Sequence, residues 1–353
     1  MRFLKSVDDR CVFLEGDKKC GLHRRFGAES KPKLCRMYPL EIAPTLDGVR
    51  IYDKGSCATF ATSARSGLPL LDDLERLLKL MPTEVEGLYH PIVKVDEYPC
   101  DFGHYDRYAK TCIQLAKRPE RSAPHTLRAI ARGLRHFAQT LRSFPLEPGQ
   151  PDAAIDALLA GDHADWFDGE PRPGEVREGA FQLSSLFSAL LVSISGAIGK
   201  SVREQGFLSQ RLLREAAQLF HVAGVLALHV AEPDEKLDPY FAALAATTVG
   251  GPEIHDVLRL SIRQQLFGLE SLADDHALAG MIGMVLSQVL SVAGARVRAV
   301  NEGRSAATAS DLSWGHMLAA RVLRKSYAAP MLIGAESAFS AILEALPAVV
   351  ALS

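Results

Sequence analysis

The sequence lacks the motifs that identify the most common nucleotide-binding and hydrolytic enzymes. It contains no G-x-x-x-x-G-K-[ST], no G-x-G-x-x-G after a predicted strand, no H-E-x-x-H and no G-x-S-x-G. It also lacks a glycine-rich strand-to-helix turn for S-adenosylmethionine and the C-x3-C-x2-C run of the radical version of that chemistry. We therefore do not expect an ordinary nucleotide-binding enzyme, a metalloprotease or an α/β-hydrolase, and a methyltransferase would need a different cofactor site.

Neither sign of charge dominates the chain. It has 42 acidic and 40 basic side chains and a formal net charge of −2, so its overall charge does not attract nucleic acid. The longest uncharged run, 179–199, is interrupted by Gln182 and several serines, whereas a membrane span needs about 20 strongly apolar residues. We expect no nucleic-acid partner and no membrane span, and we predict that this run is a buried helix of a bundle.

An apolar signal segment is missing at the start, where Met1 to Lys5 is followed by Ser-Val-Asp-Asp. We therefore expect a cytoplasmic protein. Disulfides are disfavoured in that reducing compartment, so clustered cysteines there are more often metal ligands or catalytic groups. Cysteine is also absent after Cys112, and four of the six cysteines lie at or before residue 57.

The segment from residue 11 to residue 57 is short, polar and basic, and it carries Cys11, Cys20, Cys35 and Cys57. It cannot bury enough apolar surface to offset its own ordering entropy, so another interaction must fix it. Four thiolates complete a tetrahedral zinc site or hold one iron–sulfur cluster, and nearby Lys and Arg partly offset their charge. These cysteines are the predicted ligands, with His23 in reserve; zinc and iron–sulfur both remain open, as does an unliganded set of core thiols.

The order of residues in this segment is more specific than the cysteine spacing. It reads CVFL from Cys11, CGLH from Cys20, Lys31-Pro32, CRMYP from Cys35, and then Cys57. Over about residues 1–67 this order resembles the YkgJ-type cysteine-cluster family, described as zinc- or iron-chelating, whose pattern is roughly C-x-F-L, C-x-I-H/Y, K/R-P, C-R-x-F/Y-P and a further Cys. The flagellin lysine-N-methylase family is similar, with the same cysteine pattern and a helical C-terminal portion.

The resemblance has one departure. Members of the family usually carry a further cysteine group upstream of the C-x-F-L piece, whereas only ten residues precede Cys11 here. We expect either that the true start lies further upstream or that this member has lost part of the cluster.

Two further positions in the segment have predicted roles. Gly27 is expected to allow a backbone turn with positive φ. Arg36 directly follows a predicted ligand, so its guanidinium is expected to bond a carboxylate or a backbone carbonyl and to orient that loop.

A second group of donors lies at Cys100, His104 and Cys112 in EYPCDFGHYDRYAKTC. One interpretation is a second metal site. The favoured alternative is that both thiols are small core residues, because free cysteine is among the most buried residue types.

The rest of the chain predicts a mainly α fold: a small irregular cysteine-rich metal-binding module over 1–67, a connecting segment over 68–121 and an all-α helical domain over 122–353. The connecting segment should hold a helix over 70–80 and a strand over 88–95, and a strand is expected over 48–52. Helices joined by short loops, without an alternating strand pattern, indicate a bundle. The predicted helices cover 122–143, 152–165, 178–204, 207–231, 238–248, 253–271, 274–301, 310–326 and 332–351.

Three functions follow from these features. The first is a metal-binding protein that chelates zinc or an iron–sulfur centre. The second, implied only by the resemblance, is a protein lysine N-methylase that uses this centre, S-adenosylmethionine and a protein substrate. The third is a non-catalytic adaptor in which a structural metal folds the N-terminal segment and the bundle binds a protein partner.

Overall fold

The structure is a computed structural model. The residues that it describes are 6–7, 10–17, 19–45, 48–53, 55, 57, 70–81, 92–96, 98–143, 150–161, 163–195, 210–269, 272, 276–323 and 338–351. The fold is mainly helical, as the sequence predicts.

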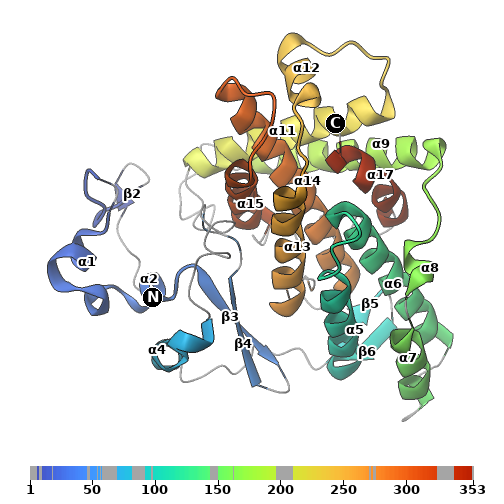
Figure 1. Ribbon diagram of the computed structural model, residues 1–353, viewed down its shortest axis with the longest axis horizontal. Helices are drawn as coiled ribbons and strands as arrows, with labels where there is room; N and C mark the ends of the chain where they lie inside the picture. The colour runs from blue at the N-terminus through green and yellow to red at the C-terminus, as the bar shows by residue number, and fades with distance from the viewer. Residues whose placement is uncertain are drawn as a thin grey trace.

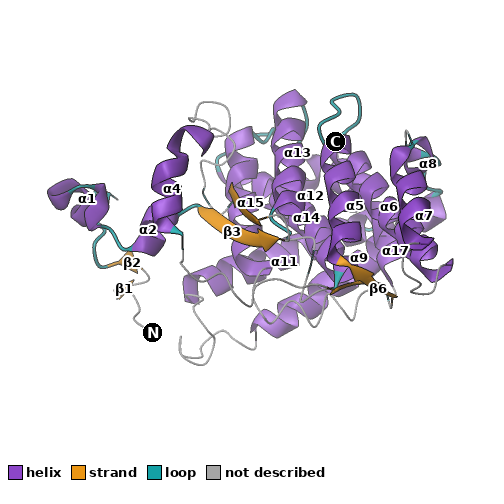
Figure 2. Ribbon diagram, turned by 90° about the horizontal axis from the view of Figure 1, so that it is seen from below, coloured by secondary structure: helices purple, strands orange, loops and turns teal. Residues whose placement is uncertain are grey.

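The N-terminal segment consists of very short elements. Two-residue strands β1 (Ser6–Val7) and β2 (Arg10–Cys11) pair antiparallel, and they precede α1 (Gly21–Phe26), the 3-10 turn η1 (Ala28–Ser30) and α2 (Lys33–Met37). Both ribbon views place α1 and α2 at one end of the molecule, away from the main body of helices (Figure 1, Figure 2).

Two longer hairpins connect this segment to the bundle. Strands β3 (Leu40–Thr45) and β4 (Gly48–Asp53) form the first, and β5 (Ile92–Val95) and β6 (Tyr98–Asp101) form the second. The strand predicted over 48–52 is thus confirmed, as is the end of the one predicted over 88–95; residues 88–91 lie outside the described part. Between the hairpins, η2 (Leu70–Asp73) and α4 (Leu74–Leu80) occupy the predicted helix.

The first hairpin is attached to the bundle through buried groups. Arg50 of β4 forms an ion pair with Asp106, and both side chains are at least nine-tenths buried. The Arg50 guanidinium also lies 5.3 Å from the ring centroid of Phe267. Tyr52 packs against Gly268, where an added Cβ would lie 2.3 Å from the tyrosine ring. These contacts fix the hairpin on one end of the bundle.

The bundle accounts for most of the described chain. Its helices are α5 (Phe102–Leu115), α6 (Ala123–Ser143), α7 (Gln150–Ala160), α8 (Ala164–Phe167), α9 (Pro173–Ser195), α11 (Gln210–Ala231), α12 (Pro239–Ala246), α13 (Pro252–Phe267), α14 (Ala277–Asn301), α15 (Ala309–Leu323) and α17 (Phe339–Ala351). They agree with the predicted helices within the described residues, with four exceptions. Helix α5 was not predicted, and the 152–165 helix is divided into α7 and α8. Helix α9 begins at Pro173 rather than at 178, and α13 ends at Phe267 rather than at 271.

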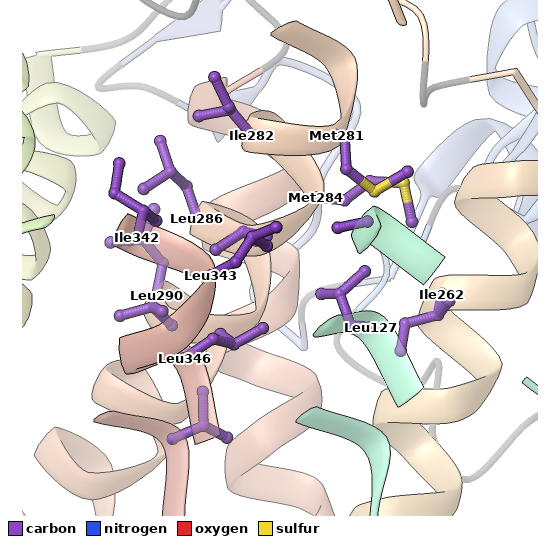
Figure 3. Close-up of a cluster of buried hydrophobic side chains, with 14 of the residues drawn as sticks. Leu127, Ile262, Met281, Ile282, Met284, Leu286, Leu290, Ile342, Leu343 and Leu346 are labelled. Carbon is purple, nitrogen blue, oxygen red and sulfur yellow. The ribbon is translucent and has the colours of Figure 1, made fainter. Parts of the chain in front are cut away.

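The core is centred on α14, which is buried along nearly its whole length. Leucine, isoleucine and methionine side chains from α6, α13, α14 and α17 meet around it, as Figure 3 shows. The α14 and α15 backbones cross closely, because an added Cβ at Gly315 would lie 2.3 Å from the Ser291 carbonyl oxygen and one at Gly294 would lie 2.7 Å from the Gly315 Cα. Only glycine permits this separation.

Among the helices that the structure describes, two are long and apolar enough to cross a membrane by length and composition alone. In α14, 94% of the apolar window is buried inside the protein, which identifies a core helix. In α9, 33% of the apolar window is buried. The prediction that the uncharged run 179–199 is a buried bundle helix therefore holds for one face of α9, which packs on α11 and α17; residues 196–199 lie outside the described part.

Helix α5 shows what the sequence interpretation missed. Asp101 caps it by accepting a hydrogen bond from the Gly103 amide (2.7 Å). Its buried residues recur at helical spacing, as at Phe102, Tyr105 and Ala109. Both signals are present in the sequence, but they overlap the residues interpreted as metal donors.

Candidate metal centre

The loop between Cys11 and Cys20 is closed by backbone contacts. Cys11 ends β2, and its carbonyl accepts a hydrogen bond from the Leu14 amide (2.9 Å). Leu14 pairs with Cys20 in an isolated antiparallel bridge, and the Gly21 amide donates to the Phe13 carbonyl (2.7 Å). Cys20 then occupies the N-cap position of α1. The two cysteines therefore lie at the two ends of one compact loop.

Cys35 is brought to the same region by the turn after α1. Gly27 has φ of 82°, which confirms the predicted positive-φ position. The Ser30 hydroxyl donates to the Leu22 carbonyl (3.0 Å), so η1 folds back onto α1. The Cys35 amide donates to the Pro32 carbonyl (2.8 Å) at the start of α2.

The Cys35 thiol is affected by the other two cysteines. Burial raises the pKa of Cys35, and negative charge at Cys11 and at Cys20 raises it further, while Lys31 lowers it. Because such charge effects weaken with distance and solvent screening, Cys11 and Cys20 are each near enough to act on Cys35. Within the described part of the chain, however, no three His, Cys, Asp or Glu side chains are grouped closely enough to hold a metal ion.

Cys57 is placed differently. It is half-buried and lies two residues after Gly55, whose amide donates to the Asp53 carboxylate (2.8 Å). An added Cβ at Gly55 would lie 2.3 Å from the His316 ring, so this part of the backbone contacts α15. The structure thus places Cys57 near the boundary between the N-terminal segment and the bundle. All six cysteines are described, and none forms a disulfide.

Three of the basic residues expected to offset thiolate charge have carboxylate partners instead. Arg24 and Arg25 pair with Glu15 (2.6 and 3.1 Å). Arg36 pairs with Glu29, which confirms the predicted carboxylate partner. In the residues described, Lys31 is the cation whose charge acts on Cys35. His23, the reserve ligand, is exposed in the last turn of α1.

The residues of the predicted second site are arranged as core and surface groups. Cys100 on β6 and Cys112 on α5 are buried, and burial raises the pKa of each thiol to about 12. His104 Nε2 lies 2.8 Å from Asp152 on α7. Thiols that hold their protons so strongly are poor metal donors, because the thiolate is the ligand form. The positions of both cysteines match the alternative of small core residues.

A buried polar network was missed by the sequence interpretation. The Ser261 hydroxyl lies 3.2 Å from His316 Nε2, the Ser291 hydroxyl lies 3.2 Å from His316 Nδ1, and Gln265 donates to Ser261 (2.9 Å). The Ser261 and His316 side chains are 1% and 2% exposed, so substrate has no access to them and we interpret the network as structural. Its members come from α13, α14 and α15, and no local motif in the sequence signals their proximity.

Comparison with known proteins identifies no relative. No family model matches the chain, and neither do curated proteins or solved structures.

Proposed function

We propose that the N-terminal segment is a metal-binding module in which Cys11, Cys20 and Cys35 supply thiolate ligands to zinc or an iron–sulfur centre. The fourth position is taken by Cys57, or by His23 in reserve. The observation that supports the proposal is that Cys11 and Cys20 lie at the ends of one closed loop and that negative charge at both acts on Cys35 of α2.

The lack of an apolar core in this segment supports the proposal. Within the described part of residues 10–45, only Gly21, Met37 and Ala43 are buried, while Val12, Leu14 and Phe26 are exposed. Such limited burial does not offset the entropy of ordering the chain. A bound metal would offset this entropy, because structural zinc contributes on the order of 10 kcal/mol or more to the folding of small modules.

The donor set also fits the chemistry. Neighbouring thiolates repel one another, and negative charge at Cys11 and Cys20 adds to the effect of burial in raising the pKa of Cys35. A divalent ion or an iron–sulfur cluster would replace that repulsion with attraction and would draw the sulfurs to coordinating distance. The chain's own contribution is to hold Cys11 and Cys20 at the ends of one closed loop and to present Cys35 from α2.

The test is metal analysis of protein purified without oxygen. Wild-type protein should contain about one equivalent of zinc, or iron and sulfide with absorbance near ~400 nm. Cys20→Ser and Cys35→Ser should each lose most of the metal, whereas Cys112→Ala, which removes a buried thiol of the bundle, should retain it. Less than about half an equivalent of either metal in the wild type would overturn the proposal.

A further inference from the structure

A cavity of about 360 Å³ lies where the second hairpin meets the bundle. Its walls come from the β5–β6 turn, from one face of α6 and from the first turns of α14 and α17. The apolar part includes Val95, Leu134 and Phe339. A volume of this size is at the lower end of the range for small-molecule sites.

Two arginines of α6 face this cavity. Arg135 and Arg142 are seven residues apart, which places them on the same face of the helix two turns apart. Arg135 is half-buried, and its guanidinium carbon lies 5.8 Å from the ring centroid of Phe339. Arg142 is exposed and lies nearer the end of the helix.

These arginines differ from their neighbours in their bonds to carboxylates. Arg128 and Arg132, two turns and one turn before Arg135, both pair with Glu344 (2.5 and 3.0 Å), whereas Glu344 and Asp96 act on Arg135 through their charge. Within the described residues, no hydrogen bond or ion pair reaches the guanidinium of Arg135 or Arg142. A guanidinium carries five N–H donors, so those that no protein group reaches are open to water or to a ligand in the cavity.

Other charges around the cavity favour an anion. Leu278 is the second residue of α14, and Phe339 and Ser340 are the first two of α17, so the positive ends of both helix dipoles border the cavity. Asp96, at the hairpin turn, is the one acidic residue among the described lining residues. Two cations thus face one carboxylate among the described lining residues, with apolar walls beside them. Glu344, which also acts on Arg135, is already bonded to Arg128 and Arg132.

We propose that this cavity binds a small organic anion, in which a carboxylate or phosphate group is carried on a compact apolar body. The anionic group pairs with Arg135, the apolar body lies against Leu134 and Phe339, and Arg142 attracts the anion at the cavity edge. This site is separate from the cysteine centre and does not depend on metal binding.

The experiment is isothermal titration calorimetry at low ionic strength with four probes: phenyl phosphate, phenylacetate, inorganic phosphate and benzyl alcohol. At least one of the two aromatic anions should bind the wild-type protein, and inorganic phosphate and benzyl alcohol should bind at least about tenfold more weakly. Arg135→Gln should weaken binding of the aromatic anion about tenfold. Arg142→Gln, at an exposed position that tolerates substitution, should weaken it to a smaller extent.

Arg177→Gln is the matched control, because it removes the same charge from an exposed position on α9 and should leave binding unchanged. Phenyl phosphate and phenylacetate distinguish a phosphate from a carboxylate ligand, and preference for either supports the site. The proposal is overturned if neither aromatic anion binds, if benzyl alcohol binds as tightly, or if the Arg142→Gln and Arg135→Gln proteins bind like the Arg177→Gln control.

Discussion

Cysteine occurs in this protein in two opposite environments. Cys11, Cys20 and Cys35 lie in a charged, poorly buried segment, whereas Cys100 and Cys112 lie in the core beside β5, β6 and α5. The first group is at least partly exposed to solvent, as the proposed metal binding requires. The second keeps its protons, because burial disfavours the thiolate.

The buried thiols make stability depend on pH in alkali. An unfolded chain releases the Cys112 proton near pH 9, whereas the folded protein holds it to about pH 12. The folded state therefore binds more protons in this window, and the free energy of unfolding should fall as pH rises, by about 1.4 kcal/mol per pH unit for each such thiol.

Urea unfolding at a series of pH values from about 9 upward measures this slope. Cys112→Ala should reduce the slope of the unfolding free energy against pH by the contribution of one thiol. Cys100→Ala should reduce it by a similar amount, independently of Cys112. Equal slopes in the wild type and both variants would show that the thiols ionise normally in the folded protein.

In the proposed metal centre the fourth ligand is a choice between two residues. Cys57 is near the bundle boundary and His23 is exposed on α1, so the two candidates lie in different parts of the segment. We expect Cys57→Ser to lower zinc affinity by tenfold or more, because a thiolate is the stronger donor, and His23→Gln to leave it within about threefold.

Competition with a chromophoric chelator at fixed pH gives both affinities. A large loss in His23→Gln together with no loss in Cys57→Ser would assign the histidine instead, and would exclude Cys57 from the centre.

At the scale of elements, helices were predictable and their contacts were not. Apolar residues at helical spacing, with Pro near the starts of α12 and α13, define those helices from sequence alone. The close crossing of α14 and α15 depends on Gly294 and Gly315 meeting in space, and a single sequence does not pair glycines of two helices. Likewise, the cysteine order indicates a shared centre, but the spacing of Cys57 does not reveal that Gly55 contacts His316.

The crossing of α14 and α15 gives a direct test of backbone packing. Gly315→Ala should lower the free energy of unfolding by about 1–3 kcal/mol, because the new methyl group would lie 2.3 Å from the Ser291 carbonyl oxygen.

Gly174→Ala, in the first turn of α9, is the control, since nothing lies within 4 Å of its added Cβ. It should leave stability unchanged or raise it by up to about 1 kcal/mol. Denaturant unfolding of both variants measures the two free energies of unfolding. Equal stabilities would mean that α14 and α15 are further apart than described.

The whole molecule consists of two parts that are stabilised differently. The bundle has one continuous apolar core, from α5 to α17. The N-terminal segment has surface ion pairs, which contribute little, and we propose that a metal supplies the rest. The two are joined through the β3–β4 hairpin, chiefly by the buried Arg50–Asp106 pair.

Removing the metal should therefore unfold the segment and spare the bundle. After treatment with a strong chelator, trypsin should cleave after Arg24 and Arg25 much faster than before, while the far-ultraviolet circular dichroism of the helices changes little. If the helical signal were lost together with the N-terminal segment, the bundle would depend on the metal and the two parts would form one cooperative unit.

The two glycine contacts at the hairpin are reciprocal. Gly55, on the N-terminal side, lies against the His316 ring of the bundle, and Gly268, on the bundle side, lies against the Tyr52 ring of the hairpin. Each side therefore offers one ring and one bare backbone position to the other. In a chimera that joins the first 57 residues to a different helical scaffold, the hairpin will pack on the scaffold only if that scaffold has both an aromatic ring and a glycine at matching positions. The N-terminal module is therefore not freely exchangeable.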